Sequence, residues 1–281
     1  VEFIQCFPNS HKMNKKLRIS IISIFFFLCC IIFAVKRMYT RKPLSPAFDA
    51  AYFWATVSYQ DQTWLYEELP TGHKYFLFIP EKFRNDKDNE QAKIPLIVTF
   101  HGSCEKGVAV SKYGRIFLSK EFQEKISANG AAVLVPLSRI DYFTDPASMS
   151  LLIQNVVIKN KCIDKTNIIG YGLSQGAKFV VEVACRKPEL FRAVISGSGF
   201  YQISIWELIS VLPVSFYSAI SEDDKGIFEQ GFKTGRLCGK WCRNSRYVEY
   251  KTRHHFWVEL DDKTGKNDET VMDWLFELVN R

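Results

Sequence analysis

Short apolar runs alternate with amphipathic segments from about Tyr75 to the end of the chain. Runs rich in Val, Ile and Phe predict strands, and apolar residues that recur every three or four positions predict helices. The predicted strands are 75–79, 94–100, 131–135, 166–170, 193–196, 214–219 and 247–250, and the predicted helices are 117–127, 148–159, 177–186, 203–211, 227–237 and 269–279. Such alternation builds an α/β fold, with a mostly parallel central sheet and helices on both faces.

Two polar segments mark the limits and connections of this α/β domain. A linker marked by prolines, 41–46, separates an N-terminal region, 1–45, from the domain at 46–281. The charged segment 81–93 lies between the first two predicted strands, and we interpret it as the solvated loop of a hairpin. We therefore expect strands 75–79 and 94–100 to be neighbours.

The N-terminal region contains an uninterrupted apolar stretch, 19–35, with basic residues on both sides. Its length is close to the lower limit for a helix that crosses a bilayer. Residues 25–30 have no polar face to leave in water, which disfavours an ordinary surface helix. We interpret 19–35 as a signal or membrane-anchor segment, and we expect an extracytoplasmic protein that is membrane-anchored or secreted.

The charge of the chain is concentrated in the same region. The formal net charge is +7, and residues 1–45, in which Glu2 is the single acid, already account for all of it. Residues 46–281 therefore sum to zero, and the domain has no overall field that would attract a polyanion. We expect no nucleic-acid partner. The spacing of Cys and His residues matches no zinc pattern, so neither a metal nor another cofactor is expected.

The pentapeptide Gly172-Leu173-Ser174-Gln175-Gly176 stands between a predicted strand and a predicted helix. A Ser at a tight strand-to-helix turn projects its hydroxyl above the edge of the sheet, and flanking glycines are needed because side chains there would collide with the strand and the helix. This context predicts that Ser174 is a nucleophile and not an ordinary turn serine.

Three further segments follow other predicted strands. Residues 100–103, Phe-His-Gly-Ser, end the second strand, and the backbone N–H groups of Ser103 and Gln175 are the predicted donors of an oxyanion hole. An acidic cluster, 222–224, follows strand 214–219, and His254 and His255 follow strand 247–250. A serine needs a histidine to take its proton and a carboxylate to orient that histidine, so the order Ser, acid, His predicts a catalytic triad.

These motifs resemble the α/β-hydrolase superfamily, in particular its esterase and polyhydroxybutyrate-depolymerase-like group and the related predicted peptidases. The similar pieces run from about Tyr75 to Leu278. Besides the motifs above they comprise Pro95–Gly102, Glu105–Gly107, Ile163–Asn167, Pro188–Ala193 and Asp273–Leu275. The resemblance implies the α/β-hydrolase fold and a serine hydrolase that cleaves small-molecule or polymeric esters. A serine peptidase of the same fold, and a binding protein that has lost activity, are the alternatives.

The chain departs from the pattern of that group around the acid and the base. Ser218-Ala219 stand where the group has His-Gly, and the acid position then falls on Glu222 without gaps, or on Asp223 or Asp224 with insertions. Asp223 lies between these matches and is the predicted acid. Both His254 and His255 can be matched, and the loop length after the last strand favours His255 as the base.

Residues 200, 201 and 206 follow strand 193–196, where residues of an acyl pocket often arise. These aromatic residues are equally consistent with an ordinary core, so the sequence leaves both readings open.

Overall fold

The computed structural model describes residues 53–59, 62–68, 74–84, 93–102, 120–137, 143–224, 229–250 and 270–279. Contacts divide the chain into two units, Val1–Ser45 and Pro46–Arg281, and all the described residues belong to the second unit. Among them, no helix is long and apolar enough to span a membrane. The predicted apolar segment 19–35 lies outside the described residues.

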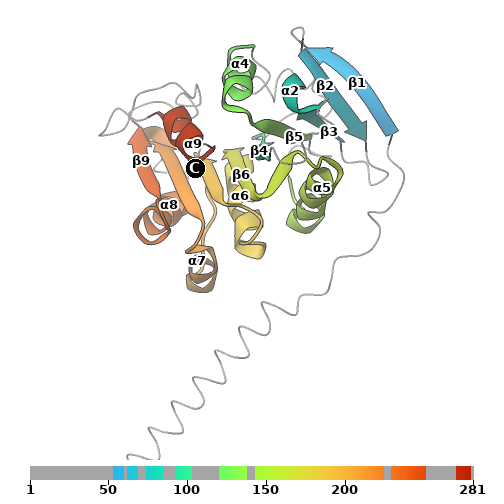
Figure 1. Cartoon of the computed structure of the whole chain (residues 1–281). Helices are drawn as coiled ribbons and strands as arrows, with labels where there is room; N and C mark the ends of the chain where they lie inside the picture. The colour runs from blue at the N-terminus through green and yellow to red at the C-terminus, as the bar shows by residue number, and fades with distance from the viewer. Residues whose placement is uncertain are drawn as a thin grey trace, which may run out of the picture. The chain divides into compact units, whose positions relative to one another are not determined.

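The described residues form nine strands in one sheet, with helices between them (Figure 1). The strands are β1 (Phe53–Tyr59), β2 (Gln62–Glu68), β3 (Lys74–Phe78), β4 (Ile94–Phe100), β5 (Ala132–Leu137), β6 (Ile163–Leu173), β7 (Ala193–Gly197), β8 (Ser215–Ser221) and β9 (Arg246–Tyr250). The helices are α2 (Glu81–Arg84), α4 (Lys120–Asn129), α5 (Pro146–Lys159), α6 (Gln175–Arg186), α7 (Ile205–Val211), the 3-10 helix η1 (Glu222–Asp224), α8 (Glu229–Trp241) and α9 (Val271–Val279).

The order of the strands is β1-β2-β3-β5-β4-β6-β7-β8-β9. The strands β1, β2, β3 and β5 pair antiparallel, and every pair from β5 through β4 to β9 is parallel. Parallel neighbours require crossover connections, which the intervening helices supply. The prediction of a mostly parallel sheet with helices is therefore confirmed.

Two apolar layers cover the two faces of the sheet. Successive strand residues point to opposite faces, so Leu96 and Val98 of β4 lie in one layer and Ile97 lies in the other. The first layer contains residues of α5, α6, α7 and α8, and the second contains residues of α4 and α9. The strands β4 and β8 are buried along their whole length, as expected for apolar strands covered on both faces.

The predicted hairpin between the first two predicted strands is wrong. β3 pairs with β2 and β5, and β4 pairs with β5 and β6, so the two strands are not neighbours. Part of the segment between them forms the short helix α2. The strands β1 and β2 were not predicted. Which strands are neighbours depends on backbone pairing between segments that are far apart in the chain. The periodicity of residues within one segment does not predict this pairing.

Candidate active site

Ser174 occupies the turn between β6 and α6 with backbone angles of φ 51° and ψ −113°. A positive φ is unfavourable for a residue with a Cβ, and such strain occurs mainly where the surrounding structure enforces it. The Ser174 N–H donates to the Gly197 carbonyl at 2.7 Å, and the Ser174 carbonyl accepts from the Lys178 N–H at 3.0 Å. The turn is thus tied both to β7 and to the first turn of α6.

The two glycines of the pentapeptide are required by close backbone packing. A Cβ at Gly172 would lie 2.2 Å from the Gly176 carbonyl oxygen, and a Cβ at Gly176 would lie 2.1 Å from the Phe100 carbonyl oxygen. Neither distance is possible for real atoms. The predicted strand–turn–helix geometry is confirmed, and it also presses the start of α6 against the end of β4.

The Ser174 side chain is not used to cap α6, although the residue stands at the N-cap position. Ser174 is 9% exposed, and a Cβ built on Gly102 would lie 3.4 Å from the Ser174 Cβ. The segment that follows β4 therefore passes directly beside the serine. Gln175 is the first residue of α6, where backbone N–H groups have no partner within the helix. This position fits the predicted role of the Gln175 N–H as a donor beside Ser174.

The strands from β4 to β9 end at one edge of the sheet because they are parallel. The register pairs near that edge are Phe100 with Gly172, Leu173 with Gly197, Gly197 with Ala219, and Ser221 with Tyr250. Residues that directly follow these positions emerge at the same edge. Ser174 and η1 therefore lie at the edge formed by the carboxyl ends of the strands. The chain also leaves β9 at this edge.

The acidic cluster differs in burial from one residue to the next. Glu222 is exposed, whereas Asp224 is 1% exposed within the η1 turn that follows β8. The side chain of Asp223, the predicted acid, lies outside the described residues, as do Ser103, His254 and His255. Among the described carboxylates of the cluster, Asp224 is the one withdrawn from solvent.

His101 also lies beside the turn, but its contacts are those of a packed side chain. Its ring centroid is 4.5 Å from that of Phe143, and Nδ1 lies 2.8 Å from the Gly102 carbonyl oxygen. A carbonyl can only accept a hydrogen bond, so Nδ1 carries the proton and donates it. Burial is the main reason that the pKa of His101 is lowered from its ordinary value. From the sequence, a structural role beside the oxyanion segment is favoured for His101 over one in proton transfer, and these contacts agree with it.

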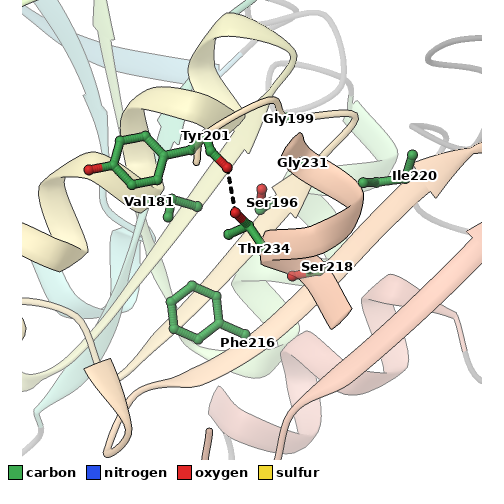
Figure 2. Close-up of a pocket in the computed structure, with 10 residues that line it drawn as sticks. Val181, Ser196, Gly199, Tyr201, Phe216, Ser218, Ile220, Gly231 and Thr234 are labelled. Atoms are coloured by element: carbon green, nitrogen blue, oxygen red, sulfur yellow. Dashed lines mark hydrogen bonds between the residues drawn. The ribbon is translucent and has the colours of Figure 1, made fainter. Parts of the chain in front are cut away.

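A small cavity lies between the sheet and α8, and Figure 2 shows the residues that surround it. Its volume is about 10 Å³, and Ser196, Ser218 and Thr234 contribute hydroxyl groups to its lining. A space of this size corresponds to roughly one water molecule. It is too small for an acyl group, and Ser174 does not line it.

The three aromatic residues of the segment after β7 have different environments. Tyr201 lines the small cavity and donates its hydroxyl hydrogen to Glu207 at 2.7 Å. Phe200 lies under the Lys178 ammonium, at 5.7 Å from Nζ to the ring centroid. Trp206 is 51% exposed on α7. Tyr201 thus belongs to the packing of the domain, and Trp206 belongs to its surface.

No protein-family model matches the sequence, and no curated protein is significantly similar to it. Solved structures do share the fold. A thermostable esterase superposes with a TM-score of 0.57 at 20% identity, over 83% of this chain and 64% of the esterase, which is less than two thirds of that protein. A ferulic acid esterase gives 0.51 at 14% identity, over 81% of this chain and 98% of that one.

The fluorophosphonate-binding serine hydrolase F of Staphylococcus aureus, a third similar structure, gives a TM-score of 0.53 at 9% identity. The match covers 82% of this chain and 99% of the other. Together with the order of the strands and the turn at Ser174, these likenesses show that the chain has the α/β-hydrolase fold.

Proposed function

We propose that this protein is a serine hydrolase that cleaves carboxylic esters through an acyl-enzyme formed on Ser174. The observation that carries the proposal is the turn itself: Ser174 has a positive φ between β6 and α6, and its hydroxyl does not cap the helix. Strained backbone of this kind concentrates at functional sites. The similar structures with TM-scores above 0.5 are two esterases and a serine hydrolase, which supports the same reaction class.

In the proposed reaction, the Ser174 Oγ forms a bond to the ester carbonyl carbon while His255 takes the hydroxyl proton. The carbonyl oxygen becomes an oxyanion, and the N–H groups of Gln175 and Ser103 donate to it. When the carbon–oxygen bond of the ester breaks, the imidazolium returns its proton to the leaving alcohol. Water then attacks the acyl-enzyme with the same histidine as base, and the acid and free Ser174 are formed.

We further propose Asp224 as the carboxylate that orients the histidine, in place of Asp223, which the sequence favours. The acid of a triad works best when it is shielded from water, because its attraction for the imidazolium is then weakly screened. Asp224 is almost completely buried at the end of β8, whereas Glu222 is exposed. The burial of Asp224 supports this choice.

We expect the purified protein to hydrolyse short-chain aryl esters and to be labelled by a fluorophosphonate on the peptide that contains Ser174. Turnover of an aryl acetate is compared with turnover of the anilide of the same acid, and labelling is located by mass spectrometry. Esters are hydrolysed more easily than amides. A hydrolase without a subsite for a peptide amine should therefore prefer the ester. Faster turnover of the anilide would favour the peptidase alternative, and labelling at another residue would contradict the assignment of Ser174.

We also propose that residues 19–35 bring the protein to a membrane and that the domain at 46–281 is extracytoplasmic. The uninterrupted apolar stretch with basic flanks supports this proposal. We expect the intact chain to sediment with membranes and to be cleaved by protease added outside the cytoplasmic membrane. Intact protein in the soluble cytoplasmic fraction would contradict the proposal.

A further inference from the structure

An apolar surface patch lies on α7 and on the C-terminal half of α8. Its members are the exposed large apolar residues of these helices, which are between 37% and 62% exposed: Ile205, Trp206, Ile209, Leu212, Leu237 and Trp241. We call this set the α7–α8 patch. Scattered apolar residues are normal on a surface, but a group of this kind that contains two Trp residues marks an interaction site.

Two hydrogen bonds link the segments at the ends of α7 to α8 and to the chain just after it. On α8, Leu237 and Trp241 are three and seven residues after Thr234, so they share its side of the helix. Thr234 accepts a hydrogen bond from the Ile203 N–H at 3.1 Å, just before α7 begins. At the other end of α7, the Leu212 carbonyl accepts from the Arg243 N–H at 3.0 Å. These two hydrogen bonds hold α7 near the half of α8 that carries Leu237 and Trp241.

Basic residues border the patch on α8 and beyond it. Between Glu229 and Glu249 the chain contains five basic residues and no acid: Lys233, Arg236, Lys240, Arg243 and Arg246. Lys233 and Arg236 form ion pairs with those two flanking glutamates. Lys240 and Arg243 are exposed, and the Lys240 Nζ lies 5.0 Å from the centroid of the Trp241 ring. Because residues 46–281 have no net charge, this is a local concentration of positive charge beside the apolar surface.

The patch and Ser174 lie at opposite ends of the sheet. Leu212 and Arg243 lie shortly before the first residues of β8 and β9, whereas Ser174 follows the last residue of β6, and these strands are parallel. In Figure 1, α7 projects below the sheet while the arrowheads of β8 and β9 point upward. A partner bound at the patch would leave the edge of the sheet with Ser174 free.

We propose that the α7–α8 patch docks onto the surface of a bilayer that contains anionic lipids. Trp residues prefer the boundary between headgroups and acyl chains, and neighbouring Lys and Arg side chains reach the lipid phosphates. Helices α7 and α8, with their exposed Trp and Leu residues and with exposed Lys240 and Arg243 near the end of α8, meet both requirements. The apolar segment 19–35 of the same chain supports a membrane as the occupant, because a chain anchored by that segment keeps the domain close to a bilayer.

The test uses the full chain in nanodiscs that hold one copy each, made of phosphatidylcholine alone or with phosphatidylglycerol. Amide hydrogen exchange is followed in α7 and in the last turns of α8. Each basic residue at an anionic surface raises the equilibrium constant for docking about fivefold. In the variant with Lys240→Gln and Arg243→Gln this constant should therefore fall on the order of 25-fold. We expect slower exchange of these segments in anionic discs only, and its loss in that double variant and in Trp206→Ser.

Ile158→Ser on α5 is the matched control, because Ile158 is 74% exposed and lies outside the patch. This variant should keep the protection in anionic discs. Unchanged exchange in both lipids would overturn the proposal. Equal protection in both lipids would also overturn it, and protection that depends on protein concentration in detergent would assign the patch to a second copy of the chain.

Discussion

Replacement of Ser174 by Ala is expected to reduce ester turnover by on the order of 10⁴ or more, because a triad without its nucleophile retains only binding and oxyanion stabilisation. The hydroxyl does not cap α6, so the variant should fold with an almost unchanged melting temperature. Turnover of a chromogenic aryl ester and thermal unfolding are measured on the same samples. Fluorophosphonate labelling should disappear together with the activity.

Ser196→Ala is the matched control for this prediction. Ser196 lies on the neighbouring strand β7 and lines the small cavity, which Ser174 does not line. Its loss should change turnover by less than about tenfold, as for a residue that does not touch the reacting atoms. Full activity in Ser174→Ala would contradict the proposed mechanism. A native protein with neither turnover nor labelling would instead support the inactive binding protein of the same fold.

Asp224→Asn is expected to lower turnover by roughly 10² to 10⁴, because the imidazole loses both the acceptor that selects its tautomer and the negative charge that stabilises its protonated form. The change preserves the size of the side chain, so the η1 turn should persist. The rate constant for an aryl ester is measured as a function of pH. In the native protein, activity should fall as the pH drops through about 6.5, where an unperturbed histidine takes up a proton.

The neighbours of Asp224 provide the controls within the same turn. Glu222→Gln and Asp223→Asn should each cost less than about tenfold, since a carboxylate that does not orient the imidazole contributes little to its protonation. A large loss in Asp223→Asn with little effect of Asp224→Asn would return the acid to the residue that the sequence favours. His255→Ala should abolish turnover and His254→Ala should only weaken it. The reverse result would exchange the two histidines within the same triad.

Several properties of this protein are determined by the sequence alone. The alternation of strands and helices and the turn at Ser174 depend on residues close together in the chain, so periodicity and the glycines at 172 and 176 were sufficient to predict them. The sequence also predicts that Ser174, the acidic cluster and the His pair share one edge of the sheet. Each of them follows a predicted strand, and parallel strands bring their carboxyl ends to one edge.

The tertiary structure alone decided which strands are neighbours and which acidic side chain is buried. β3 pairs with β5 and not with β4, and β1 and β2 extend the sheet, because strand pairing joins segments that are far apart in the chain. Asp224 and Glu222 are indistinguishable by pattern, and only the packing around η1 makes one of them almost inaccessible to water. The α7–α8 patch likewise depends on the fold, which leaves apolar residues of both helices at the surface.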